Sequence, residues 1–296
     1  MEDNLFELSS ELKNKEYKHS NYTAFCVSDP KLRRIHKATV RDRVLHHAIF
    51  RILYPLFDKS FIFDSYSCRF DKGTHRAVNR LAKFLGKLSH NNRDLIFALK
   101  CDIRKFFASI NQNILLRLIT KKIKDENSIW LIEKIIRSFS RGLPLGNVTS
   151  QIFANIYLNE LDQFVKHKLK VKYYLRYCDD FIILSQDKEY LKNLILLIDN
   201  FLNKTLNLSI HPDKIIIKKY SQGIDFLGYV VLPCHRALRT KSRRRIFKKI
   251  KISKEKLKAG FINNESFNQS LQSYYGMLKH CNGYKLKIKV DKIINN

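Results

Sequence analysis

Two observations in the sequence predict an α+β fold with an antiparallel sheet backed by helices. Runs rich in β-branched and aromatic residues, which are typical of strands, occur around residues 95–101, 172–185 and 223–231. Other stretches carry apolar side chains at helical spacing, so the order of elements is strand, helix, hairpin, helix and strands. The chain has 296 residues, 45% of them hydrophobic, so it can also bury a sizeable core.

The first 60 residues predict two helices and a basic hairpin. Leu5, Leu8 and Leu12 mark a short helix. The basic residues 31–40 alternate weakly and predict a short hairpin. Apolar residues at helical spacing over 44–52 then predict a second helix.

The neighbouring histidines His46 and His47 lie on this second predicted helix and could be taken for metal ligands. Adjacent positions on a helix face different directions, so they make a poor ligand pair. We therefore expect structural roles for both.

Residues 61–73 predict a strand-like run that ends at a glycine. Thr74 can then cap the next helix, whose apolar stripe faces the core. Arg69, Lys72 and Arg76 lie around the start of this helix. Cationic side chains and free backbone N–H groups at a helix start can hold a phosphate.

The next segment, residues 95–102, predicts a buried strand that ends in a carboxylate, Asp102. Binding residues collect at the carboxyl ends of strands in α/β folds. An aspartate that only terminates a strand is the alternative. A second acidic segment further along the chain favours a site.

Residues 111–140 predict helices, and a loop over 141–151 with two glycines and a proline leads into a long helix. One face of that helix is polar and rich in amides: Gln151, Asn155, Asn159 and Asp162. Amides can hydrogen-bond bases or backbone, and they also occur on solvated faces. The pattern leaves both alternatives open.

Residues 172–185 predict a hairpin with two acids, Asp179 and Asp180, at its turn. Adjacent carboxylates repel each other unless a cation sits between them, so the pair is a candidate metal site. Aspartate is also common in solvated turns. The hairpin by itself does not distinguish the two.

The rest of the chain predicts a helix over 191–202, a strand with a turn over 208–217 and a hairpin over 223–231. Residues 236–258 hold twelve basic side chains and one acid, with a narrow apolar stripe at helical spacing. An ordinary amphipathic helix follows over 267–278.

The net charge of +29 at pH 7 indicates a polyanionic partner, most simply nucleic acid held through its phosphates. An acidic membrane surface is the alternative, but there is no lipidation motif and no run of about 18 apolar residues. We expect no membrane partner.

Two further features indicate a reducing, cytoplasmic location. The acids Glu2 and Asp3 after Met1 are unlike the basic start of a signal peptide. The six cysteines form no CxxC pair, so neither a zinc site nor a disulfide framework is expected.

Asp102 on one strand, a Gly/Pro loop leading into a helix, and Tyr177-Cys178-Asp179-Asp180 on a hairpin together resemble the reverse transcriptases. The glycine of Phe226-Leu227-Gly228-Tyr229 strengthens the match, which extends from about residue 33 to 286. Within that group the chain is most similar to the enzymes of diversity-generating retroelements, in residues 61–78, 142–162 and 271–286.

The resemblance implies a right-hand polymerase. Fingers are expected over 1–94, a palm with an antiparallel sheet over 95–232, and a basic helical thumb over 233–296. The helices at about 111–140 would contribute to the fingers.

The resemblance also implies phosphoryl transfer with two metal ions. Asp102 and Asp179 are the expected ligands of two Mg²⁺ ions, with Mn²⁺ as an alternative metal and the Ile103 carbonyl as a further ligand. Neighbouring side chains on a strand point apart, so Asp180 is expected to bind less directly. Lys214 matches a family lysine that is proposed to protonate the leaving pyrophosphate.

By the same resemblance, Arg69 and Lys72 would hold the triphosphate of the incoming nucleotide. Phe107, five residues after Asp102, would leave no room for a 2′-hydroxyl and so would favour deoxynucleotides. Packing in the core beside Phe106 is the alternative for this ring.

Leu145, Gly146 and Gln151 are expected to contact the substrate. Group II intron enzymes usually carry Pro-Gln-Gly where this chain has Pro144-Leu145-Gly146. An aliphatic side chain there forfeits a glutamine's hydrogen bonds, and the resemblance links this to error-prone copying of template adenines.

The basic residues after the palm are expected to clamp the backbone of a nucleic acid duplex. The residues proposed for this contact are Arg239, Lys241, Arg243, Arg244, Arg245 and Lys248.

The function implied is that of an RNA-directed DNA polymerase, which extends a primer on an RNA template into cDNA from dNTPs. A small basic helical accessory protein is the expected partner of a diversity-generating enzyme. The first alternative is a reverse transcriptase of a group II-like, retron or phage-defence system. The second is a catalytically silent nucleic-acid-binding scaffold, against which the three aspartates argue.

Overall fold

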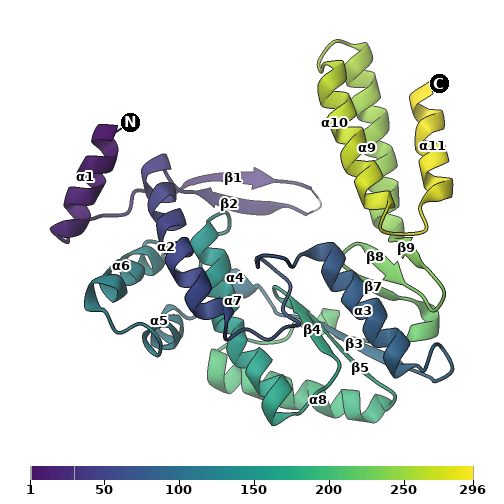
Figure 1. Cartoon of the computed structure of the whole chain (residues 1–296), viewed down its shortest axis with the longest axis horizontal. Helices are drawn as coiled ribbons and strands as arrows, with labels where there is room; N and C mark the ends of the chain where they lie inside the picture. The colour runs from purple at the N-terminus through teal and green to yellow at the C-terminus, as the bar shows by residue number, and fades with distance from the viewer. Residues whose placement is uncertain (1, 30, 296) are drawn as a thin grey trace. The chain divides into compact units, whose positions relative to one another are not determined.

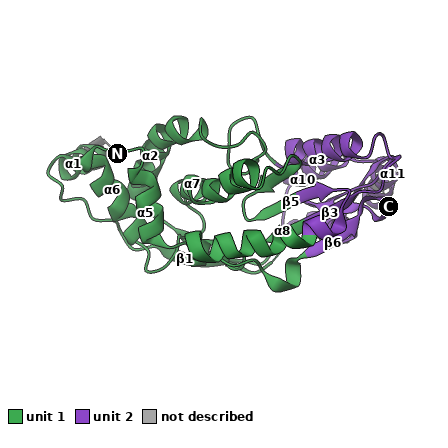
Figure 2. Cartoon of the chain, turned by 90° about the horizontal axis from the view of Figure 1, so that it is seen from below, with its two compact units in different colours: residues 1–73, 100–182, 192–215 green, residues 74–99, 183–191, 216–296 purple. Residues whose placement is uncertain are grey.

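A computed structural model describes residues 2–29 and 31–295, which form two compact units (Figure 2). The first unit comprises residues 1–73, 100–182 and 192–215, and the second comprises residues 74–99, 183–191 and 216–296. These units interleave along the sequence and do not test the predicted fingers, palm and thumb. The boundaries of those three subdomains remain a prediction.

The first unit holds the N-terminal helices, a two-stranded hairpin and the helices around α7 (Figure 1). Its elements are α1 (Glu2–Lys13), β1 (Thr23–Val27), β2 (Arg33–Lys37), α2 (Val40–Asp58), α4 (Phe106–Ser109), α5 (Gln112–Thr120), α6 (Glu126–Arg137), α7 (Val148–Gln163) and β4 (Tyr174–Tyr177). Helix α2 packs against α7. The helices predicted in these segments are confirmed.

The hairpin differs from the prediction of a hairpin within residues 31–40. Strand β2 pairs antiparallel with β1, and Phe25 lies opposite Ile35. The prediction is wrong because the partner strand lies upstream of residue 31. Residues 23–27 are exposed along their whole length, so they lack the alternation that burial of one face would impose.

The second unit holds a small antiparallel sheet and the C-terminal helices. Its elements are α3 (Thr74–Leu88), β6 (Ile216–Lys219), β7 (Ile224–Phe226), β8 (Tyr229–Val231), β9 (Arg236–Leu238), α9 (Thr240–Lys258), α10 (Asn264–Leu278) and α11 (Tyr284–Asn295). Strand β8 pairs antiparallel with both β7 and β9, which confirms the hairpin over 223–231. None of the helices within the described residues is long and apolar enough to cross a bilayer.

A four-stranded sheet runs in the order β4, β5, β3 and β6, and the division between the units passes through its two middle strands. These strands are β3 (Phe97–Asp102) and β5 (Asp180–Ser185), and helix α8 (Lys188–Phe201) follows β5. Leu99 on β3 and Phe181 on β5 are completely buried. The α+β class is therefore confirmed.

His46 is a buried residue of α2, only 1% exposed, and it is not paired with His47. Its Nδ1 lies 3.1 Å from the Thr149 hydroxyl, and its Nε2 lies 3.1 Å from Nε2 of His19. Burial, together with His19, lowers the pKa of His46 to about 4. The histidine is thus neutral at pH 7 and joins α2 to the start of α7, in agreement with the structural role expected from the sequence.

Residues 61–73 form a looped segment, and the prediction of a strand-like run here is wrong. Cys68 and Asp71 adopt left-handed φ angles of +54° and +57°, which an extended strand cannot accommodate. The loop forms an isolated parallel bridge to strand β4, between Ser65 and Arg176. Of the apolar residues that suggested a strand, Phe61 and Tyr66 are buried and anchor the loop, whereas Phe63 and Phe70 are exposed.

Arg176 on β4 and Asp162 on α7 form an ion pair with no solvent exposure on either side chain. Two guanidinium N–H groups donate to the two Asp162 oxygens, at 2.8 and 2.6 Å. The other three donate to Ser65 Oγ, Asn155 Oδ1 and the Cys178 carbonyl. Burial would lower the pKa of Arg176, but Asp162 outweighs it and holds that pKa above its ordinary value.

Replacing Arg176 with methionine should lower the free energy of unfolding by about 3–5 kcal/mol, because Asp162 would be left as an uncompensated buried charge. Urea denaturation followed by circular dichroism measures this loss. The matched control is Arg137→Met, which breaks the exposed pair with Glu133 on α6 and should cost less than about 1 kcal/mol. Equal losses in the two variants would contradict the central role of the buried pair.

Candidate active site

Three aspartates lie where β3 ends and where the β4–β5 hairpin turns. Asp102 is the last residue of β3, Asp179 lies in the two-residue turn, and Asp180 is the first residue of β5. Strands β3 and β5 are neighbours in the sheet, and the Ile103 N–H donates to the Asp179 carbonyl at 3.2 Å. The backbone itself therefore joins the end of one strand to the turn of the other.

Two lysines neutralise part of this acidic cluster. Lys214 Nζ lies 2.6 Å from Asp102 Oδ1, and Lys100 Nζ lies 3.3 Å from Asp180 Oδ2. Lys214 is positioned by a short helical turn that begins after His211, whose N–H donates to the Asp102 carbonyl at 2.8 Å. The sequence analysis assigned Lys214 to the site but did not assign Lys100.

The cluster remains short of positive charge. Burial, together with Asp102, raises the pKa of Asp179. Burial also raises the pKa of Asp180 to about 6, although Lys100 opposes the rise. The second oxygen of Asp180, Oδ1, is buried and has no hydrogen-bond partner in the described part of the chain.

These properties fit a hard divalent cation, which prefers carboxylate oxygens and would relieve the repulsion. Within residues 2–29 and 31–295, no group of three histidine, cysteine or acidic side chains is arranged to hold a metal ion by itself. Further ligands would have to come from the backbone, where Ile103 is the predicted donor, or from substrate.

The turn before Asp179 is strained. Cys178, a non-glycine residue, has a left-handed φ of +55°. Burial raises the pKa of the Cys178 thiol, and the neighbouring Asp179 and the Cys68 thiol contribute to the rise. Lys105, at the start of α4, has a similar φ of +46°. Residues with a strained backbone therefore lie just before Asp179 in the turn and shortly after Asp102.

A narrow cavity beside the turn brings Phe107 and Gln151 together, two residues that the sequence assigned to substrate contact. Cys68, Cys178 and the buried Phe106 also line it. The cavity holds only about 10 Å³ and cannot accommodate a nucleotide. Phe107 is half-buried, and its ring stands edge-on to that of Phe106 at 5.3 Å, so the packing alternative for this ring is part of the structure.

Leu145 and Gly146 lie against strand β2. The Leu145 carbonyl accepts a hydrogen bond from the His36 N–H at 2.8 Å. A side chain added at Gly146 would come within 2.7 Å of Ile35, and the Asn147 amide donates to the His36 carbonyl at 3.2 Å. The half-buried Leu145 side chain is thus held on a backbone fixed from both sides.

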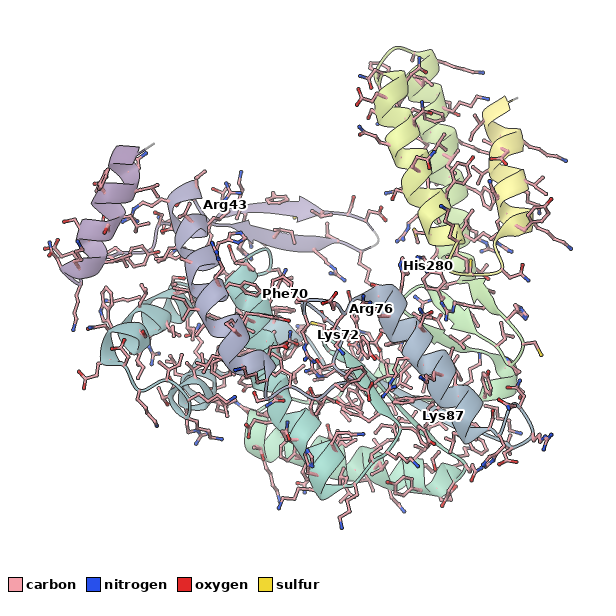
Figure 3. All side chains as sticks on the ribbon, viewed as in Figure 1. Arg43, Phe70, Lys72, Arg76, Lys87 and His280 are labelled. Atoms are coloured by element: carbon pink, nitrogen blue, oxygen red, sulfur yellow. The ribbon has the colours of Figure 1, made fainter. Side chains whose placement is uncertain are left out.

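Arg69 acts first as an anchor of loop 61–73. Its guanidinium donates to Asp58 at 2.6 Å and to the Ile62 and Ser65 carbonyls at 2.7 and 3.1 Å, and its side chain is 7% exposed. Lys72, labelled in Figure 3, lies over the Phe63 ring and donates to the Phe63 carbonyl at 2.9 Å. The two cations expected on a triphosphate are therefore in one loop, but Arg69 is largely occupied by the protein.

In the second unit, the basic residues predicted to bind nucleic acid are on and before α9. Arg239 precedes the helix, and its guanidinium pairs with Asp225. Arg245 is half-buried. The exposed members are Lys241, Arg243, Arg244 and Lys248. Further along the helix, α9 and α11 border a groove lined by four lysines and one acid: Lys251, Lys254, Lys258, Lys292 and Glu255.

The family described as "Reverse transcriptase (RNA-dependent DNA polymerase)" matches residues 18–231, which include the whole acidic cluster. The chain belongs to the reverse transcriptase family. The match ends within the second unit, before α9.

Curated relatives of this family member are distant. It is 24% identical to Protein YkfC of Escherichia coli, over 73% of this chain and 66% of YkfC. It is also 24% identical to the group II intron-encoded protein LtrA of Lactococcus lactis, over 67% of this chain and 44% of LtrA. A putative COX1/OXI3 intron 2 protein of Saccharomyces cerevisiae is 23% identical, over 64% of this chain and 29% of that protein. The chain thus spans less than two thirds of the length of these relatives.

Solved structures of telomerase share the fold of this family member. The Candida albicans enzyme, in complex with a fragment of telomeric RNA, superimposes with a TM-score of 0.60 at 12% identity, over 99% of this chain and 58% of that one. The apo Candida tropicalis enzyme gives 0.59 at 14% identity, over 85% and 56%. At such low identity the likeness is one of fold alone.

Two residues of the amide-rich face of α7 support the site from behind, a role that the sequence does not predict. The Asn155 amide donates to the Ser67 carbonyl at 2.9 Å. Asp162 on the same face holds Arg176. Asn155 and Asp162 are therefore buried against backbone and charge, whereas Gln151 is exposed and Asn159 is half-buried. An arginine inside an apolar strand was the available signal, because such a charge needs a buried partner.

Gly142 lies in loop 141–147, where the backbone closely approaches the residues after β3. It has a φ of +68°, and an added Cβ would overlap the Phe107 carbonyl oxygen, which accepts the Leu143 N–H at 2.8 Å. Gly142→Ala should lower the free energy of unfolding by more than about 2 kcal/mol. Gly86→Ala, in open space on α3, should raise it by up to about 1 kcal/mol. Thermal unfolding of both variants measures the contrast, and a neutral Gly142→Ala would contradict the close approach.

Proposed function

We propose that this chain is an RNA-directed DNA polymerase that extends a primer on an RNA template, with dNTPs as substrates. The observation that carries the proposal is the junction of Asp102 and Asp179 on hydrogen-bonded backbone at the edge of the sheet. Phosphoryl transfer needs concentrated negative ligands for cations more than it needs a covalent nucleophile. The buried, unpaired oxygen of Asp180 supports the same assignment.

Asp102 and Asp179, with Asp180 beside them and the Ile103 carbonyl, would hold two Mg²⁺ or Mn²⁺ ions, which supply charge neutralisation when a 3′-hydroxyl attacks a nucleotide phosphate. Lys214 Nζ lies 2.6 Å from Asp102 Oδ1, and Lys214 is the proposed proton donor to the departing pyrophosphate. Lys100 offsets part of the charge of Asp180.

For the incoming nucleotide, Lys72 is the proposed contact to the triphosphate, and Arg69 chiefly fixes the loop that presents it. Phe107 would exclude a 2′-hydroxyl from the sugar site, with Gln151 across the same cavity. The net charge of +29 and the exposed cations of α9 support binding of RNA template and cDNA through their phosphates.

Replacing Asp179 with asparagine should reduce primer extension on an RNA template by at least about 100-fold, because a charged ligand is lost. The assay uses dNTPs and Mg²⁺ and follows a labelled primer. Asp187→Asn is the matched control, since Asp187 only caps α8 and asparagine caps equally well. The Asp179→Asn variant should fold, because the substitution removes like-charge repulsion at the β4–β5 turn.

Two results would contradict the proposal. One is full extension by Asp179→Asn. The other is a lack of extension by both the unsubstituted chain and the Asp179→Asn variant when a structured RNA and a small basic helical accessory protein are supplied. That result would favour a catalytically silent scaffold.

We further propose that the enzyme copies template adenines with errors, as part of a diversity-generating retroelement. The support is Leu145, an aliphatic residue on a loop fixed to β2, where a glutamine would offer hydrogen bonds to substrate. Relatives such as LtrA support the alternative of a group II-like lineage, and retron or phage-defence systems share the same chemistry. A template and variable repeat beside the gene would separate these lineages.

Replacing Leu145 with glutamine should lower misincorporation opposite template adenine by about tenfold, which is the effect of one restored hydrogen bond of about 1.4 kcal/mol. Sequencing of cDNA from an RNA template measures errors at each base. Leu196→Gln is the control, because Leu196 is 71% exposed on α8 and lies outside the loop. An unchanged error spectrum in Leu145→Gln would contradict the assignment.

A further inference from the structure

Cys68 of loop 61–73 and Cys178 of the β4–β5 turn line the same narrow cavity beside the acidic cluster. Cys68 is exposed and Cys178 is half-buried. Two other exposed thiols, Cys26 and Cys234, do not line this cavity. Of the six cysteines, Cys68 and Cys178 are therefore the pair that shares this cavity.

Backbone pairing brings these two residues to neighbouring positions. Ser65 forms a parallel bridge with Arg176, whose N–H and carbonyl bond to the loop at 2.9 Å on each side. Carried on by two residues, the register of this isolated bridge would set Ser67 beside Cys178. The Ser67 and Cys178 carbonyls are also bound by one linked pair of side chains, Asn155 and Arg176.

The Cys68 side chain turns back toward this position. Its Sγ lies 3.4 Å from the hydroxyl of Ser67, the residue that the register sets beside Cys178. Cys68 and Cys178 both have left-handed φ angles, of +54° and +55°. Both cysteines therefore line one cavity, and Cys68 is open to solvent.

We propose that Cys68 and Cys178 form an oxidisable thiol pair, and that a hydroperoxide converts them into a disulfide between loop 61–73 and the turn that carries Asp179. Exposed thiols next to a second thiol are the pattern of redox-sensitive cysteines. In a reducing compartment such a bond would be transient and reversible.

The reaction balances in two steps. The Cys68 sulfur attacks hydrogen peroxide, which breaks the O–O bond, leaves Cys68 as a sulfenic acid and releases one water. The Cys178 sulfur then attacks the Cys68 sulfur, forms the S–S bond and releases the second water. Two thiols are oxidised, and one peroxide is reduced to two waters.

The bond would close the cavity shared by Phe107 and Gln151 and would fix the Asp179 turn to the loop of Lys72. The expected consequence is loss of nucleotide addition. This consequence rests on the proposed polymerase function, whereas formation of the bond does not.

Peptide mapping by mass spectrometry tests the bond directly. Trypsin releases residues 60–69 with Cys68 as the only cysteine and residues 177–188 with Cys178 as the only cysteine. After hydrogen peroxide and alkylation of free thiols, we expect these two peptides linked, lighter by two hydrogens, and separated again by dithiothreitol. Primer extension should fall at least tenfold with the same dose and return with dithiothreitol.

Two variants make the test specific. Cys68→Ser should give no linked peptide and should extend primers equally well before and after peroxide. A Cys26→Ser/Cys234→Ser protein should still form the link. Oxidation of Cys26 and Cys234 without any 60–69/177–188 link would overturn the thiol pair. Peroxide inactivation that persists in Cys68→Ser would overturn the claim that the Cys68–Cys178 bond controls primer extension. A chain with no polymerase activity that still forms the link would refute only the proposed function.

Discussion

The buried ion pair of Arg176 and Asp162 is the interaction on which the site depends. Two charges without solvent are tolerated only when every donor and acceptor is satisfied, and all five N–H groups of Arg176 are used. Through these bonds one side chain ties α7, loop 61–73 and the Cys178 carbonyl to strand β4. The turn that carries Asp179 therefore has little freedom to move relative to the helix behind it.

The acidic cluster in front of this support is held in an unfavourable electrostatic state. Burial raises the pKa of both Asp179 and Asp180, and Lys100 and Lys214 offset only part of the repulsion. The folded chain bears this cost because strand pairing and the buried ion pair fix the backbone on both sides. A site in this state gains most from added divalent cations, which agrees with the chemistry of the reverse transcriptase family to which the chain belongs.

The site residues that lie at the ends of strands with a clear sequence pattern were predictable. Asp102 closes an apolar run, and Asp179 sits between a run rich in tyrosine and a run rich in isoleucine, so local pattern located both at strand ends. The roles in loop 61–73 were not predictable in the same way. Its left-handed residues break the strand that its composition suggested, and Arg69 bonds to Asp58 and to carbonyls whose positions no local pattern specifies.

The sequence by itself determined the α+β class, the places of most helices and strands, the acidic motif and the basic charge of the chain. These depend on periodicity, composition and short spacing, which a chain carries before it folds. Only the tertiary structure decided that Asn155 and Asp162 of the amide-rich face are buried, that Lys100 is the counter-ion of Asp180, and that Cys68 and Cys178 line one cavity. Each of these brings together residues that are distant in sequence, and the partners are selected by packing and by the need to satisfy buried polar groups.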